Sequence, residues 1–178
     1  MNRKSTLFVA SLLLVLAVVS GVATAVQDKY TVQLPDGLPF SDWRGYEDWQ
    51  LISTSKTDDR MKVILGNPTI IAAFKSGIPG NGKPFPEGSK IAKVQWKPKK
   101  STEAPFVVDV PDTLADLFFM EKDSKKFPKT GGWGYAQFDY DPASATYSAD
   151  KAGAPDCGQV CHVAVKSKDY VFHPYQMR

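Results

Sequence analysis

The residues whose types and spacing are best suited to chemistry lie together near the C-terminus: Cys157, Cys161 and His162. The chain reads Cys-Gly-Gln-Val-Cys-His from position 157, so three residues separate the cysteines and the histidine follows directly. A deprotonated thiol is a strong nucleophile, and a neutral imidazole is the commonest metal ligand in proteins. The cluster therefore predicts either covalent attachment of a metal-bearing group or, if the thiols pair with each other, a disulfide.

This cluster resembles the attachment motif of haem c, in which two thiols add to the haem vinyl groups and the histidine reaches the iron. The usual motif has two residues between the cysteines, whereas this chain has three. The extra residue is expected to bulge outward, with Gly158 supplying the backbone freedom. A disulfide between Cys157 and Cys161, with His162 incidental, is the alternative, and the motif alone leaves both interpretations open.

The N-terminus has the order of a secretory signal, because a short basic stretch and an apolar run over residues 7–22 precede small residues at Ala23 and Ala25. The sequence predicts a signal peptide over residues 1–25, cleaved after Ala25. An uncleaved membrane anchor is the alternative, but the apolar run is short for a span of roughly 20 residues. The mature chain, residues 26–178, is expected to be periplasmic and free of the membrane.

Charge and length limit the classes of function. The chain has 22 basic and 19 acidic residues, and loss of Arg3 and Lys4 with the signal peptide leaves 20 against 19. This nearly neutral balance gives no electrostatic argument for binding nucleic acid. The mature length suits one domain with a hydrophobic core and is short for two, so a single domain is predicted over residues 26–178.

The patterning of the mature chain predicts an α+β fold, mainly an antiparallel β-sheet with a few helices on one side. Asn67 is suited to cap a helix over residues 68–76, with proline at its first position and Gly77 at its end. Residues 114–121 suit either a helix or a strand. Strands are expected over residues 51–54, 61–66, 90–97, 106–110 and 131–140, with an arm or edge strand over residues 26–34.

Several further segments resemble the cytochrome P-460 family. They are residues 119–124 followed by 130–135, residues 169–172, and residues 63–67 leading into the predicted helix. The similarity runs from about Trp49 to the C-terminus, in order and with similar spacing. It implies a haem c domain related to the cytochromes c′-beta, with the haem packed against one sheet face and a soluble cytochrome as electron acceptor, and it suggests a homodimer.

The resemblance also implies roles for individual residues. His162 would be the proximal iron ligand, and Cys157 and Cys161 would form the thioether attachments. In hydroxylamine-oxidising members a lysine bonds covalently to the haem edge, and this position falls on Lys93. Strand alternation puts that lysine on one face with Ile91 and Gln95, whereas Ala92, Val94 and Trp96 share the other. An ordinary surface lysine is the alternative role.

Two positions depart from the family pattern. Lys62 stands where oxidising members have an arginine, and Phe118 stands where they have a distal carboxylate. A carboxylate would accept a proton during oxidation of hydroxylamine, and phenylalanine cannot do so. An apolar residue suits a neutral diatomic such as nitric oxide. Asp116, Glu121 and Asp123 are candidate replacements for the base, but the sequence does not say which face they occupy.

Three functions of different classes follow. The first is a haem enzyme that oxidises hydroxylamine, favoured by Lys93. Phe118 and Lys62 count against that enzyme. The second is a cytochrome that binds nitric oxide without turnover, which the apolar Phe118 suits. The third is a haem-free exported binding domain closed by a disulfide. His173 is the other histidine, and it is expected at the surface rather than as a second axial ligand or a proton relay.

Overall fold

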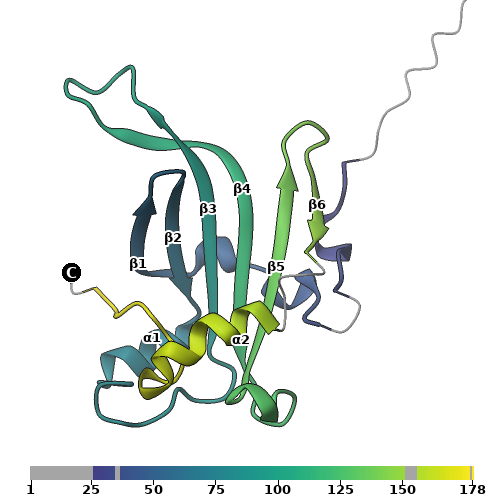
Figure 1. The fold of residues 1–178 in the computed structure, drawn as a ribbon, viewed down its shortest axis with the longest axis vertical. Coiled ribbons are helices and arrows are strands. Elements are labelled where there is room, and N and C mark those ends of the chain that lie inside the picture. The colour runs from purple at the N-terminus through teal and green to yellow at the C-terminus, as the bar shows by residue number, and fades with distance from the viewer. Residues whose placement is uncertain (1–25, 35–36, 151–155, 177) are drawn as a thin grey trace, which may run out of the picture.

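The computed structural model describes residues 26–34, 37–150, 156–176 and 178. Its centre is a six-stranded antiparallel sheet in the order β1-β2-β3-β4-β5-β6, so each strand pairs with its neighbours in sequence (Figure 1). The strands are β1 (Gln50–Thr57), β2 (Arg60–Gly66), β3 (Lys90–Lys100), β4 (Asp109–Lys122), β5 (Trp133–Asp141) and β6 (Thr146–Ala149). The predicted α+β class with a mainly antiparallel sheet is thereby confirmed.

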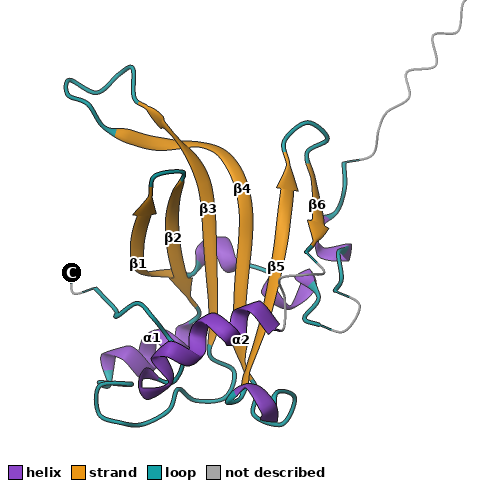
Figure 2. Ribbon diagram, viewed as in Figure 1, coloured by secondary structure: helices purple, strands orange, loops and turns teal. Residues whose placement is uncertain are grey.

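The helical elements are short (Figure 2). They are α1 (Pro68–Lys75), α2 (Asp156–His162) and the 3₁₀ turns η1 (Lys29–Thr31), η2 (Phe40–Trp43), η3 (Tyr46–Asp48), η4 (Pro128–Thr130) and η5 (Val163–Lys168). Helix α1 forms as predicted, because the Asn67 side chain accepts a hydrogen bond from the Ile70 N–H at 3.1 Å. The chain leaves the helix at Gly77, whose φ of 91° favours glycine.

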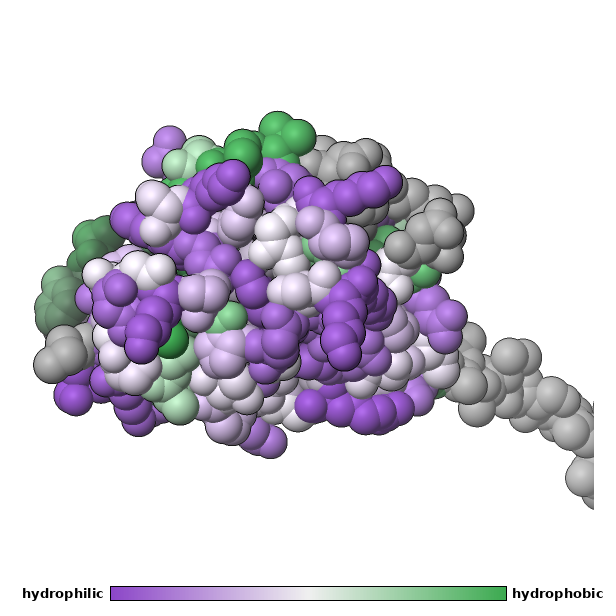
Figure 3. Space-filling model, turned by 90° about the horizontal axis from the view of Figure 1, so that it is seen from below, coloured by the Kyte–Doolittle hydropathy of each residue, from purple (hydrophilic) through white to green (hydrophobic). Residues whose placement is uncertain are grey.

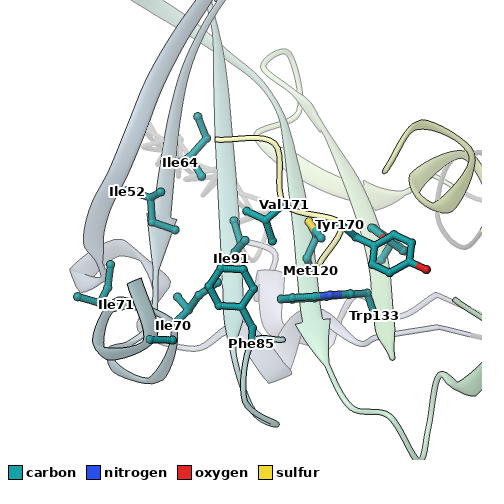
Figure 4. Packing of buried hydrophobic residues seen from close by; sticks show 12 residues of the cluster. Ile52, Ile64, Ile70, Ile71, Phe85, Ile91, Met120, Trp133, Tyr170 and Val171 are labelled. Atoms are coloured by element: carbon teal, nitrogen blue, oxygen red, sulfur yellow. The ribbon is translucent and has the colours of Figure 1, made fainter. Parts of the chain in front are cut away.

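The two faces of the sheet carry different hydrophobic clusters. Residues 92, 94, 117, 119, 136 and 138 point to one face, where they pack against the N-terminal turns that hold Phe40 and Trp43. The opposite face carries a second cluster with α1 and the C-terminal segment, in which Met120, Trp133 and Tyr170 lie close together (Figure 4). This division confirms the predicted alternation in β3, since Ala92 and Val94 belong to the first cluster and Ile91 to the second.

Some predicted elements were wrong or incomplete. Residues 26–34 form no strand; they contain the turn η1, in which the Asp28 carboxylate accepts from the Tyr30 N–H at 3.0 Å. A local side-chain hydrogen bond therefore competes with extended pairing there. Residues 114–121, left ambiguous by the pattern, lie within β4. Neither β6 nor α2 was predicted.

The face of the molecule in Figure 3 is mostly polar, with hydrophobic residues gathered mainly at its margins. The hairpin between β3 and β4 extends well beyond the other strands (Figure 1) and exposes Phe106 and Val107. Among the described residues, no helix has the length and hydrophobicity needed to cross a membrane. The predicted signal peptide, residues 1–25, lies outside the described residues.

Candidate functional site

A cavity of about 230 Å³ lies between the second sheet face and the segment formed by α2 and the C-terminal residues. Its walls are mainly apolar. Strands β2 to β5 supply one wall, and α2 with residues 171–173 supplies the other. The lining includes Ile64, Ile91, Lys93, Phe118, Met120, Tyr135, Gln137, Gly158, Cys161, His162, Val171, Phe172 and His173. The site residues predicted from two distant parts of the chain therefore meet in one cavity.

His162 stands at the C-terminal end of α2 and is held by its ring nitrogen Nδ1, which donates to the Tyr170 carbonyl oxygen at 2.5 Å. The Tyr135 and Phe172 rings lie beside it, with centroids 5.2 Å and 4.8 Å from the imidazole centroid. Burial lowers the pKa of His162, which favours the neutral ring. Because Nδ1 is engaged, Nε2 remains available as a ligand, in the arrangement typical of metal-binding histidines.

The cysteine motif is helical. Positions 157 and 161 are one turn apart in α2, and Cys161 is exposed at the cavity, whereas the Cys157 side chain lies outside the described residues. The expectation that Gly158 frees the backbone for an outward bulge is not met, because Gly158 lies within the helix. Its small size serves packing instead: a Cβ there would lie 2.4 Å from Cγ of Tyr135.

Replacing Gly158 with alanine is therefore expected to push α2 away from β5 and to lower the free energy of unfolding by about 1–3 kcal/mol, the usual range for overpacking. Thermal unfolding would measure the loss. Val160→Ala is the matched control, because Val160 is 71% exposed on the same helix. If the two variants unfold at the same temperature, the close packing of Gly158 on Tyr135 does not contribute to the free energy of unfolding.

Lys93 points from the centre of β3 toward the cavity. In the register of the sheet it stands between Ile64 on β2 and Phe118 on β4, and Phe118 in turn pairs with Gln137 on β5. The Lys93 Nζ lies 4.0 Å from the centroid of the Phe118 ring. Burial, and then the positive charge of Lys62, lower the pKa of Lys93. The alternative of an ordinary surface lysine is not what the structure shows.

The other predicted cavity residues are placed as follows. Phe118 lines the cavity, while the side chain of Phe119 packs on the far face, stacked on Trp43 with 4.5 Å between ring centroids. Lys62 is partly buried and close enough to influence Lys93 electrostatically, but it is not among the lining residues. His173, expected at the surface, is instead partly buried and lines the cavity.

The structure separates the three candidate carboxylates. Glu121 pairs with Lys90, with 3.2 Å between the charged atoms, and Asp123 accepts backbone N–H bonds in the turn after β4. Asp116 alone of these three shares the face of Phe118, which it precedes by two residues in β4.

Asp116 lies among polar side chains at the edge of the cavity wall. The Gln95 amide donates to it, and the Arg60 Nε lies 3.7 Å from its other oxygen. Burial raises the pKa of Asp116, while Arg60 and Lys93 oppose the shift. Sequence reasoning left this residue among three candidates, although its even spacing from Phe118 was a usable signal.

The residues present fit a haem. The apolar walls suit a flat macrocycle, His162 offers one ring nitrogen whose partner nitrogen is already bonded, and Cys161 stands at the same wall. Sequence reasoning missed the Tyr170 carbonyl and the Tyr135 ring that frame the histidine. A backbone acceptor carries no residue-type signal, so only the fold reveals it.

Comparison with known proteins agrees with this chemistry. The family model described as Cytochrome P460 matches residues 43–173, which is most of the chain and includes the whole cavity. No curated protein matches the chain. The chain therefore belongs to the cytochrome P460 family, which implies a haem cofactor.

Proposed function

We propose that this protein is a periplasmic haem c enzyme that oxidises hydroxylamine and passes the electrons to a soluble cytochrome. The observation that carries the proposal is Lys93: its amine reaches the cavity from mid-strand and has a lowered pKa because of burial. A neutral amine is a nucleophile, whereas a protonated amine is not, because its lone pair is bonded to the proton. A lysine amine inside the cavity supports the covalent attachment to haem that the resemblance to oxidising members of the family implies.

His162 is assigned as the iron ligand through Nε2, and Cys157 and Cys161 are assigned as the thioether attachments. When bound, the haem supplies the iron through which electrons leave the substrate. The bond to Lys93 replaces one hydrogen on the amine and one on the ring carbon, so its formation requires a two-electron oxidant such as a peroxide. The protein's own contribution would be to present the Lys93 amine to the cavity and to exclude water with Ile64 and Ile91.

Oxidation of hydroxylamine releases protons as well as electrons, so the cavity needs a proton acceptor. Asp116 is assigned this role in place of the missing distal carboxylate. It lies on the cavity face, two residues before Phe118 in β4, and burial raises its pKa above the ordinary value of an aspartate. Because Asp116 does not line the cavity, a water molecule would have to relay the proton to it.

A second candidate function, binding of nitric oxide without turnover, is supported by one specific observation. The residue beside Lys93 on the cavity wall is Phe118, an apolar ring that suits a neutral diatomic and donates or accepts no proton. The two functions share the haem and differ in whether Lys93 is bonded to it.

The first test is the mass of the mature protein, produced with a haem c assembly system. We expect the chain cleaved after Ala25 plus one haem, and two hydrogens fewer if Lys93 is also bonded. In a Lys93→Leu background, Cys157→Ala with Cys161→Ala should lose the haem on denaturation, because neither the thioethers nor the lysine bond remains. A haem-free mass lower than the bare chain by two hydrogens would instead show a disulfide and would contradict the proposal.

A further inference from the structure

An ion pair is buried at the end of the cavity wall opposite to Asp116. The Lys122 Nζ lies 2.8 Å from Oδ1 of Asp169, and the two side chains are 6% and 11% exposed. Lys122 also donates to the Gly131 carbonyl at 2.9 Å, and Asp169 accepts a second bond from the Phe85 N–H at 2.7 Å. The pair is therefore fully hydrogen-bonded, as buried charges must be.

The aspartate of this pair lies in an unusual turn. Asp169 and Tyr170 have φ values of 48° and 65°, two consecutive non-glycine residues in the left-handed region. Such residues persist only where their surroundings over-determine the backbone. Here Lys122 and Phe85 hold the Asp169 carboxylate, and the Tyr170 ring packs on the backbone of Gly131, where a Cβ would lie 2.3 Å from the ring.

The carbonyl at the end of this turn is the one that binds His162. Tyr170 contributes its oxygen to Nδ1 of the imidazole, so the turn sets both the position and the direction of that hydrogen bond. Lys122 belongs to β4, which also carries Phe118 in the cavity wall. The chain Lys122–Asp169–Tyr170–His162 thus ties the orientation of the histidine to the rigid sheet.

We propose that Lys122 and Asp169 are positioning residues for His162, acting by fixing the Tyr170 carbonyl. The inference rests on the proposed role of His162 as the iron ligand. A carbonyl bonded to Nδ1 fixes the tautomer and makes Nε2 a stronger donor to the metal. Loss of the ion pair releases the left-handed turn, weakens that bond and lowers the electron donation from the histidine, which favours the reduced state of the metal.

The test uses haem-loaded protein and two single variants, Asp169→Asn and Lys122→Met. We measure the ratio of reduced to oxidised protein at one fixed redox potential of the solution. We also measure, by resonance Raman spectroscopy, the iron–histidine stretching frequency of the reduced form. Each variant should raise the ratio about tenfold, a change as large as the smaller losses of metal affinity or activity that follow removal of an outer-shell partner. Each variant should also lower the stretching frequency. Lys122→Arg, which retains the charge, should restore both values toward those of the parent.

The sign of the two shifts separates positioning from plain electrostatics. Asp169→Asn removes a negative charge and Lys122→Met a positive one, so a direct field effect would move the ratio in opposite directions. Positioning through Tyr170 moves both in the same direction, and opposite shifts would overturn the inference. Lys90→Met is the matched control, because it breaks the Lys90–Glu121 pair, whose side chains are 21% and 16% exposed, without touching the turn.

Two outcomes separate the positioning role of Lys122 and Asp169 from the role of His162 as iron ligand. Parent protein that carries haem but shows no iron–histidine band would refute the ligand role of His162, and with it both proposals. Parent protein with a normal band, together with variants that fold and keep the parent's ratio and frequency, would refute only the positioning role of Lys122 and Asp169.

Discussion

Lys93→Leu is expected to abolish hydroxylamine oxidation and to remove the red-shifted ferrous absorption band, while the haem stays attached through Cys157 and Cys161. The substitution removes the amine and keeps a side chain of similar bulk between Ile64 and Phe118. Without the amine no bond to the ring edge forms, so the spectrum should become that of ordinary haem c. Absorption spectra of the reduced protein, and electron transfer from hydroxylamine to an added acceptor, measure the two effects.

Lys97→Leu is the matched control, because Lys97 is exposed on the same strand and does not line the cavity. An unchanged spectrum in Lys93→Leu would exclude the cross-link and leave the nitric-oxide-binding function.

The pH dependence of cross-linking gives a second check. Since burial and Lys62 lower the pKa of Lys93, the neutral amine is already populated below the usual lysine range, and cross-linking should accelerate as pH rises through that lowered pKa. Lys62→Met should raise the pKa and slow the reaction at neutral pH.

Phe119→Ala is expected to lower the free energy of unfolding by roughly 3–5 kcal/mol, the usual cost of removing a buried aromatic ring. Phe119 is 1% exposed and contacts the rings of Phe40, Trp43, Tyr46 and Phe138, so alanine leaves a large cavity in the first cluster. Urea unfolding of the two proteins measures the difference. A loss of this size is a large part of the total stability of most domains.

Phe118→Ala is the control at the adjacent position. Phe118 faces the cavity and is only partly buried, so its loss should cost about 1 kcal/mol or less and should instead change the affinity for nitric oxide. The two neighbours thus separate stability from ligand binding. Equal destabilisation by both substitutions would contradict the assignment of the two rings to opposite faces.

Strands β1, β2, β3 and β5 and helix α1 could be predicted because their signals are local, whereas residues 106–108 of the strand expected over residues 106–110 lie outside β4. Alternation over two residues assigned the faces of β3, and one cap, one proline and one glycine bounded α1 within a residue. Helix α2 had no such signal: it is seven residues long and contains Gly158 and Val160, which are poor helix formers. Its close approach to Tyr135 is a tertiary contact, which the local sequence does not encode.

The candidate site was predictable to the same extent. Lys93 was singled out by the resemblance to the cytochrome P-460 family, and strand alternation showed only which side chains share its face. His162 was singled out by the cysteines that precede it. The turn that orients the histidine was not predictable, because Lys122 and Asp169 are 47 residues apart and the acceptor is a main-chain carbonyl. Asp116 required the register of β4 against β3 and β5 before its face was known.

The order of the strands in the sheet has a consequence for how the protein matures. Each strand pairs with its sequence neighbours, so the sheet is complete at Ala149, and its nucleation requires few distant contacts. The wall that bears Lys93 therefore assembles without the segment that bears Cys161 and His162. If the chain folds in this order, the sheet face that bears Lys93 forms first and stays open to solvent. The segment that bears Cys161 and His162 then packs against it last. We therefore expect the cavity to close last, when this segment packs against the finished sheet.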